Sequence, residues 1–165
     1  MAVDAQTYKS ALAQFSSGVT VVTTRHNDVP IGLTVSAFAS LSLEPPLVLV
    51  CILKGLFTYT ALEESGAYAV NILSAGQKEF GLRFAGLIPG LDDRFAGLAY
   101  TTAVTGSPIL PGVLAWVDCR TVQITDGGDH GIFVGEVIAA GTPNQGEPLL
   151  YHNRHWGGFT PKAPG

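Results

Sequence analysis

Residues 32–43, GLTVSAFASLSL, alternate in polarity, and this pattern constrains the fold more than any other stretch of the chain. The apolar positions are Leu33, Val35, Ala37, Ala39, Leu41 and Leu43, and the positions between them are Thr34, Ser36, Phe38, Ser40 and Ser42. Successive side chains of a β-strand point to opposite faces, so the alternation predicts one strand with an apolar face and a hydroxyl-bearing face. The hydroxyl face meets either water or a polar ligand.

Further segments with strand-like sequences are separated by turn or helix signals. They are 18–24, 47–53, 68–73, 113–125 and 131–141. The last two read as a hairpin with a long, glycine-rich turn, DGGDH, at 126–130, whereas 86–112 is rich in Gly and Pro and is expected to be irregular.

Three helices are expected around these strands. One spans 4–15 with Asp4 as its N-cap, the second spans 57–66 and ends at Gly66, and the third follows a Ser74–Gln77 capping box. Helices this sparse do not fit a doubly wound sheet. The pattern instead predicts a mainly β protein, a closed or partly closed antiparallel barrel with a few peripheral helices, as one domain over 1–165.

The chain is apolar and carries little charge. Of its 165 residues, 47% are hydrophobic and 13% are charged, and the net charge is -4. A surface with so little charge is often covered by another copy of the same chain, which favours self-association. The acidic balance argues against nucleic-acid binding, which calls for a basic surface.

Nothing in the sequence indicates a membrane span or a signal peptide. The longest apolar run is LVLVCIL (47–53), far below the roughly 20 residues that cross a bilayer, and the N-terminal residues lack basic and apolar blocks. Cys51 and Cys119 both lie within strand-like runs, which favours buried free thiols over a disulfide. We therefore expect a cytoplasmic protein.

Several common catalytic and binding motifs are missing from the sequence. No GxGxxG follows a strand and no GxxxxGK[ST] occurs, so a nucleotide would have to be held by other means. No Ser-His-Asp or Cys-His arrangement is recognisable. His152 and His155 lie three residues apart beside Tyr151 and Trp156, but no Cys or carboxylate ligand stands at a suitable spacing. A role in aromatic packing or as a lid over a pocket is therefore favoured, and a metal site is not.

The junction after the strand 47–53 is a candidate anion site. Lys54 and Thr58 flank the start of a helix, where free N–H groups and the positive end of the helix dipole attract phosphate. Together with the hydroxyl face of 34–42 they could hold a phosphate. The alternative is an ordinary solvated sheet face beside a surface lysine.

Two further positions have both a functional and an ordinary interpretation. Arg83 and Phe84 either border a ligand or are a surface arginine beside a core phenylalanine. His130, in the Asp129-His130 pair, is either solvated or contacts a ligand, to which a histidine can donate a proton near neutral pH.

Six stretches of the chain together resemble the flavin reductase family, the NAD(P)H:flavin oxidoreductase components of two-component monooxygenases such as hydroxyphenylacetate or phenol hydroxylase. They are QFSSGVTVVTT (14–24), GLTVSAFASLSLEPPLVLVC (32–51), YAVNILSAGQKEFGLRFAG (68–86), DRFAG (93–97), GSPILPGVLAWVDCRTVQITDGGDHGIFVGEV (106–137) and PLLYHN (148–153). The similarity covers nearly the whole chain in order. It implies an FMN-binding split β-barrel, Greek-key-like and antiparallel, that forms a homodimer and binds FMN or FAD near the dimer interface.

The resemblance also implies which residues bind the flavin. The cofactor-binding positions are Thr34, Val35, Ser36, Ala37, Ser40, Cys51, Ile52, Leu53, Lys54, Phe57, Thr58, Arg83, Phe84 and, with the weakest match, Tyr151. His130 matches a histidine placed near the nicotinamide. The chain departs from the family at Leu56, where a serine is common, so the phosphate contact is expected to depend more on Lys54 and Thr58.

The implied function is NAD(P)H-dependent reduction of free FMN or FAD, which supplies reduced flavin by diffusion to a separate monooxygenase. Two alternatives are a resident FMN that reduces ferric iron or a quinone, and a non-catalytic flavin-binding electron carrier. The sequence leaves open the choice between FMN and FAD and the substrate of the partner oxygenase. It favours NADH over NADPH, because no basic pair is evident for a 2′-phosphate.

Overall fold

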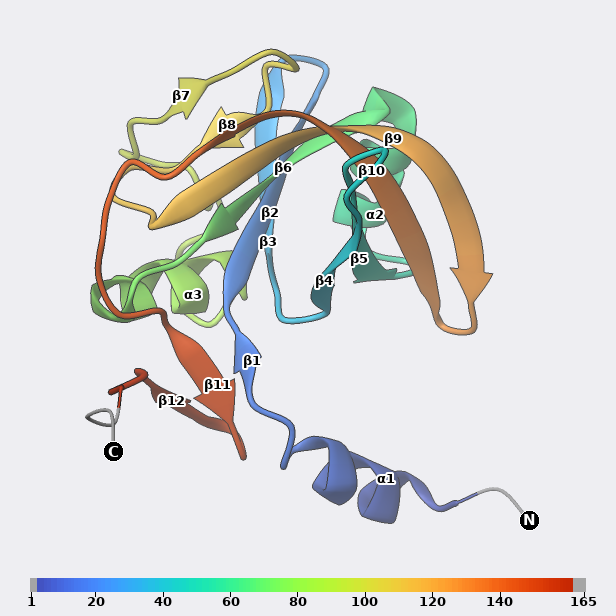
Figure 1. Cartoon of the computed structure of the whole chain (residues 1–165), viewed down its shortest axis with the longest axis vertical. Helices are drawn as coiled ribbons and strands as arrows, with labels where there is room; N and C mark the ends of the chain where they lie inside the picture. The colour runs from blue at the N-terminus through green and yellow to red at the C-terminus, as the bar shows by residue number, and fades with distance from the viewer. Residues whose placement is uncertain (1–2, 162–165) are drawn as a thin grey trace.

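A computed structural model of the chain, which describes residues 3–161, is built around one antiparallel sheet of seven strands (Figure 1). In spatial order the strands are β3 (Val29–Val35), β2 (Thr20–His26), β6 (Ala67–Ile72), β9 (Ala115–Gly127), β10 (His130–Gly141), β5 (Leu47–Leu53) and β4 (Phe38–Ser42). The sheet coils around a core, and the mainly β class expected from the sequence is confirmed.

The stretch 32–43 is two strands and not one. β3 pairs with β2 and β4 pairs with β5, so these successive strands form opposite edges of the sheet. Ser36 and Ala37 link them and belong to neither strand. Within the described residues no ladder joins β3 to β4, so the barrel is not closed there by hydrogen bonds.

The expected division into an apolar and a hydroxyl face fails at this link. Val35 is buried before it, but after it Phe38 packs against the core, whereas Ala39, Leu41 and Leu43 of the apolar set are exposed. The physical reason is that the chain changes partner strand at Ser36–Ala37, so the alternation of faces does not continue across the link.

The helices have the predicted capping residues, although α1 ends earlier than expected. α1 (Ala5–Leu12) is capped by Asp4, and Figure 1 shows it away from the sheet, with no buried residue. α2 (Phe57–Ser65) ends at Gly66, whose φ of 63° is readily adopted by glycine. The Ser74–Gln77 capping box is present, but it begins a short 3₁₀ turn, η1 (Ala75–Gln77), that leads into α3 (Lys78–Phe84).

Short strands complete the fold. β1 (Ser17–Gly18), β11 (Leu150–His152) and β12 (His155–Gly157) form a small sheet, and β7 (Thr101–Thr102) pairs with β8 (Pro108–Ile109) inside the otherwise irregular segment 86–112. The β9–β10 turn contains only Gly128 and Asp129 and is therefore shorter than predicted, because Asp126 and Gly127 remain paired in β9.

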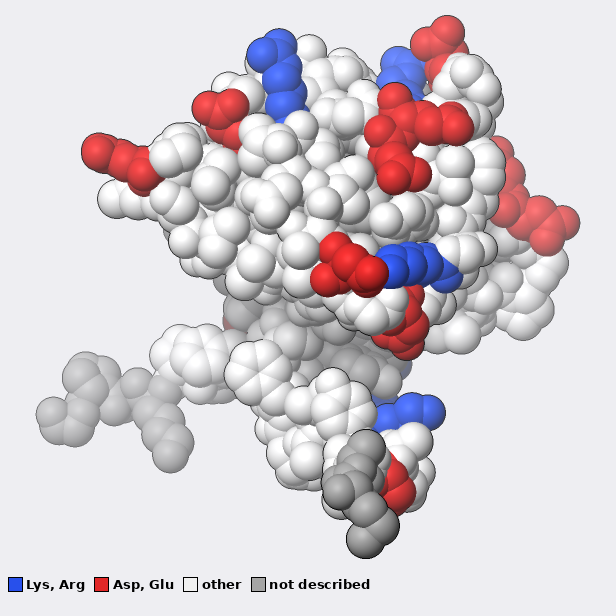
Figure 2. Space-filling view, turned by 90° about the vertical axis from the view of Figure 1, so that its right-hand side faces the viewer, with Lys and Arg blue, Asp and Glu red and all other residues white. Residues whose placement is uncertain are grey.

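The core consists of two apolar clusters. One lies inside the coiled sheet and includes Val50, Tyr68 and Phe133, and the other lies beside α3 and includes Phe84 and Phe95. On the face shown in Figure 2 uncharged side chains dominate, and the Lys and Arg side chains are scattered rather than gathered. In the described part of the chain no helix has both the length and the apolar character needed to cross a membrane.

Candidate functional site

A hollow of about 250 Å³ lies where the two edges of the sheet approach each other; we call it the β3–β5 hollow. It is lined by Leu33, Thr34, Val35, Ser36, Ala37, Cys51, Leu53, Leu56 and His130. Its wall therefore combines the end of β3, the two-residue link, the end of β5 and the start of β10. The fold brings together here seven of the residues that the sequence marked for binding or catalysis.

The link Ser36–Ala37 borders more than one hollow. Ser36 also lines a hollow of about 220 Å³ with Tyr151 and Trp156, and both link residues line one of about 530 Å³ beside α1. Cys51 N–H donates to the Ala37 carbonyl (3.0 Å), which fixes the link against β5. Among the hydrogen bonds of residues 3–161, none uses the N–H of Ser36 or of Ala37 as donor.

Helix α3 is held close to β3 at the edge of these hollows. The Thr34 hydroxyl donates to the Gly81 carbonyl at 2.7 Å, so this member of the predicted hydroxyl face contacts protein. Gly81 has no side chain, and a Cβ there would lie 2.7 Å from the Trp156 ring, so glycine allows β12 to pack against the helix. The contact places Trp156 beside Tyr151, with ring centroids 5.2 Å apart.

A further hollow of about 440 Å³ adjoins the β3–β5 hollow, because Leu33 and Leu56 line both. Phe57 and Thr58, at the start of α2, line this second hollow together with Asp92, Asp93 and Arg94. The predicted junction residues 57 and 58 are therefore separated from His130 by the two leucines.

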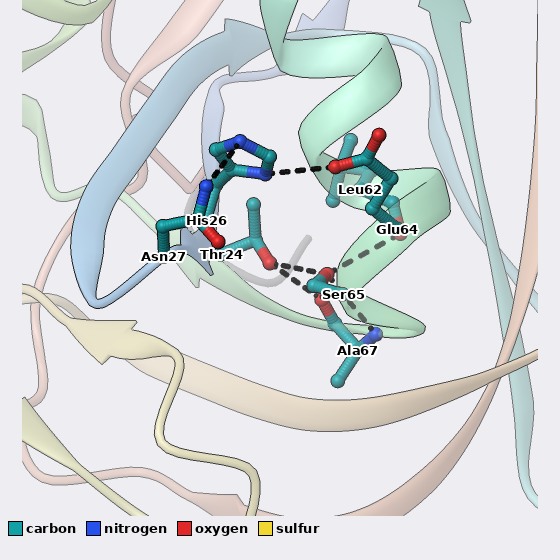
Figure 3. A network of polar contacts seen from close by, with 7 residues as sticks. All are labelled: Thr24, His26, Asn27, Leu62, Glu64, Ser65 and Ala67. Atoms are coloured by element: carbon teal, nitrogen blue, oxygen red, sulfur yellow. Dashed lines mark hydrogen bonds and ion pairs between the residues drawn. The ribbon is translucent and has the colours of Figure 1, made fainter.

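A polar network fastens α2 to β2 (Figure 3). The Thr24 hydroxyl contacts Ser65 Oγ at 2.7 Å and donates to the Ala67 carbonyl at 2.8 Å. His26 Nδ1 lies 3.1 Å from a Glu64 carboxylate oxygen, and the His26 ring meets Phe57 edge to face at 5.2 Å. Both ends of α2 are thus attached to the same strand.

Lys54 and His130 each make polar contacts at the tip of the β9–β10 hairpin. Lys54 Nζ donates to Asp126 Oδ1 at 2.6 Å and to the Gly128 carbonyl at 2.7 Å. His130 Nδ1 lies 2.7 Å from Asp129 Oδ1. Hydrogen bonds from Lys54 and from His130 hold the pKa values of Asp126 and Asp129, respectively, below their usual range.

Eight predicted residues do not line the β3–β5 hollow: Lys54, Phe57 and Thr58, described above, and Ser40, Ile52, Arg83, Phe84 and Tyr151. Ile52 and Phe84 are fully buried in the two core clusters, and Ser40 is exposed on β4 without lining any of these hollows. Arg83 turns to the loop after α3, where its guanidinium donates to the carbonyls of Arg94, at 2.6 Å, and of Ala96. Tyr151 lines the neighbouring hollows.

Cys51 contributes a neutral side chain to the wall. Burial raises the pKa of its thiol, so the thiol stays protonated at neutral pH. Cys51 and Cys119 are both free. Among residues 3–161 no group of three or more His, Cys, Asp or Glu side chains could hold a metal ion.

Sequence reasoning missed Leu33 as a wall residue and Asp126 as the partner of Lys54. The polarity pattern places Leu33 on the core face of one continuous strand. Nothing in that alternation indicates that part of this face lines a hollow. Asp126 stands beside two glycines in a turn-like sequence, which signals a turn but not a contact 72 residues away.

Comparisons with known proteins identify the family of the chain. Residues 12–160 match the family described as flavin reductase like domain. The reductase subunit HsaB of a flavin-dependent monooxygenase from Mycobacterium tuberculosis is 41% identical over 165 residues, covering 97% of this chain and 85% of that protein. FMN reductase (NADH) SmoA of Agrobacterium fabrum is 38% identical, covering 95% of this chain and 87% of the relative.

Among solved structures, the NADH:FAD oxidoreductase SgcE6 of Streptomyces globisporus, in complex with NAD and FAD fragments, superimposes with a TM-score of 0.89. It is 33% identical, and the match covers 99% of each chain.

Proposed function

The chain belongs to the flavin reductase family, and on that premise we propose that it transfers a hydride from NADH to FMN or FAD and releases the reduced flavin to a separate monooxygenase. The observation that carries this proposal is the β3–β5 hollow, which gathers Thr34–Ala37, Cys51, Leu53 and His130 in one wall.

The wall suits a flat ring system with one polar edge. Leu33, Leu53 and Leu56 supply apolar surface, and the N–H groups of Ser36 and Ala37 are available as donors. Ligand pockets usually measure about 300–1,000 Å³, so one hollow of about 250 Å³ is small by itself. It adjoins two larger hollows, at Ser36–Ala37 and at Leu33–Leu56, which together offer room for a nucleotide tail.

A bound flavin supplies the redox chemistry, because its N5 accepts a hydride from the nicotinamide C4. The protein contributes positioning, since hydride transfer needs the reacting atoms to be about 3–3.5 Å apart. The Ser36 and Ala37 N–H groups stabilise negative charge on the polar edge of the ring. His130 orients the nicotinamide and does not act as an obligatory base.

We also propose that the protein is a homodimer that acts in the cytoplasm. Phe15 and Leu43 are 78% and 87% exposed, and Tyr8 and Leu12 of α1 are also exposed, so these apolar side chains are left uncovered by the rest of residues 3–161. A second copy would cover it, and free thiols such as Cys51 suit a reducing compartment. Sedimentation at micromolar concentration tests the dimer, and a monomer there would overturn it.

The experiment that tests the function is anaerobic. Purified protein is mixed with NADH and a large excess of free FMN, and the absorbance of oxidised flavin is followed. We expect many equivalents to be bleached per protein, at a rate that saturates with FMN. Bleaching that stops near one equivalent would identify a resident flavin with another acceptor. No bleaching with FMN or FAD and with NADH or NADPH would leave a flavin-binding carrier.

A further inference from the structure

Lys54 makes three contacts with the β9–β10 turn. Its backbone N–H donates to the Asp129 carbonyl at 2.9 Å, and its ammonium donates to Asp126 Oδ1 at 2.6 Å and to the Gly128 carbonyl at 2.7 Å. All three acceptors lie 72 or more residues further along the chain. The side chain that the sequence marked for a phosphate is thus directed to the hairpin tip.

The contacts continue from Lys54 to the β3–β5 hollow. Asp126 Oδ1 also accepts from the Gly128 N–H at 3.0 Å, which closes the turn. Asp129, the next residue, holds His130 Nδ1 at 2.7 Å, and His130 lines the hollow. Because a carboxylate accepts at Nδ1–H, the neutral imidazole carries its free lone pair on Nε2.

The β-ladders hold the backbone of the tip, because His130 pairs with both Gly127 and Leu53, but its side chains have few other restraints. The last six residues of β9, from Val122 to Gly127, are all exposed, so apolar packing does not hold this part of the hairpin. The β5–β10 ladder places His130 opposite Leu53, which sets the backbone but not the direction of the imidazole. That direction depends on Asp129, and Asp129 belongs to the turn that Lys54 holds.

We propose that Lys54 and Asp126 form a latch that holds the β9–β10 turn, so that Asp129 directs the His130 imidazole into the β3–β5 hollow. Lys54 is then a positioning residue for the nicotinamide and not a ligand of the flavin phosphate. The lowered pKa of Asp126 agrees with a latch that stays ionised at neutral pH. This inference rests on the proposed function, in which His130 orients the nicotinamide.

The two roles of Lys54 predict different effects of paired substitutions. Lys54→Met and Asp126→Ala each remove one side of the latch, and only Lys54→Met would remove a phosphate ligand. With a latch, both variants raise the KM for NADH by about three- to tenfold with kcat nearly unchanged, and the double variant is no worse than either single one. The Kd of FMN, measured by fluorescence quenching without turnover, stays within twofold of the wild type.

Lys78→Met is the matched control, because the Lys78 side chain is exposed and makes no hydrogen bond or ion pair within residues 3–161. Hydrogen–deuterium exchange adds a readout that needs no activity: peptides covering 126–132 exchange faster in Lys54→Met and Asp126→Ala than in wild type or Lys78→Met. If the wild type reduces no free flavin, the proposed function fails, whereas the exchange experiment still tests the latch.

Two results would overturn the inference. A tenfold weaker Kd for FMN in Lys54→Met, with no change in Asp126→Ala, would make Lys54 a phosphate ligand. An unchanged KM for NADH in both variants, with unchanged exchange at the tip, would show that the contact does not position His130.

Discussion

Two aspartates of β9 fix neighbouring segments of the chain in opposite surroundings: Asp118 at the base of the β9–β10 hairpin and Asp126 at its tip. At the base, the fully buried Asp118 accepts from the N–H groups of Val104 and Thr105, both at 2.8 Å, and from the Thr105 hydroxyl at 2.5 Å. At the tip, the Asp126 side chain is 79% exposed and accepts from Lys54 and Gly128. A buried acceptor stabilises the fold strongly because its loss leaves unpaired donors, whereas an exposed ion pair contributes little to stability. Asp118 therefore fastens the loop between β7 and β8 to β9 and stabilises the fold, whereas the contacts at the tip can serve the site.

The largest expected effect is on stability at the base. Asp118→Ala leaves three donors without their acceptor and should lower the free energy of unfolding by about 3 kcal/mol. Urea denaturation followed by tryptophan fluorescence measures this. Asp126→Ala serves as the control and should leave the unfolding midpoint nearly unchanged. Equal losses in the two variants would remove the distinction between base and tip.

The next effect is on catalysis at the tip. His130→Ala should raise the KM for NADH about tenfold, the loss of roughly one hydrogen bond, and should leave kcat within about twofold. His155→Ala, which removes an exposed imidazole from another hairpin, is the control and should leave both constants unchanged. A large fall in kcat with unchanged KM would instead place His130 in the hydride-transfer step.

The smallest expected effect is a difference between base and tip in how the free energy of unfolding depends on pH. Burial, with a further contribution from the charge of Asp118, raises the pKa of Cys119 to about 12. The unfolded thiol titrates near pH 8.5, so stability is complete below that pH and falls as the pH rises toward about 12. Cys119→Ala should flatten this alkaline fall by on the order of 1 kcal/mol per pH unit, as measured by urea denaturation at pH 8, 9 and 10.

At the tip the contribution to stability changes with pH in the opposite direction. Hydrogen bonds lower the pKa values of Asp126 and Asp129, so their contribution is present above the ordinary aspartate pKa and is lost as the pH falls through the lowered values. A slope in Cys119→Ala identical to that of the wild type would contradict the assignment of the alkaline loss to the base.

Local signals in the sequence were sufficient for most individual elements. Gly66 ends α2, Asp4 caps α1, and the Ser74–Gln77 box begins the turn before α3, because each signal acts within about four residues. The apolar run 47–53 forms β5 as expected. The resemblance to flavin reductases supplied most of the residues that the β3–β5 hollow brings together.

Other features could not be found by local reasoning. The polarity pattern of 32–43 continues across Ser36–Ala37 although the chain changes partner strand there, from β2 to β5. The side on which α3 packs decides where Arg83 and Phe84 point: Phe84 is fully buried, and the Arg83 guanidinium donates to loop carbonyls.

The sequence by itself determined most of the strands, the helix caps and the membership of the flavin reductase family, because periodicity, caps and motifs are local properties of the chain. Only the tertiary structure decided that Ser36–Ala37 opens onto several hollows and that Lys54 holds the turn before His130. The physical reason is that both depend on how the coiled sheet brings its edges and its longest hairpin together, across separations that no local pattern encodes.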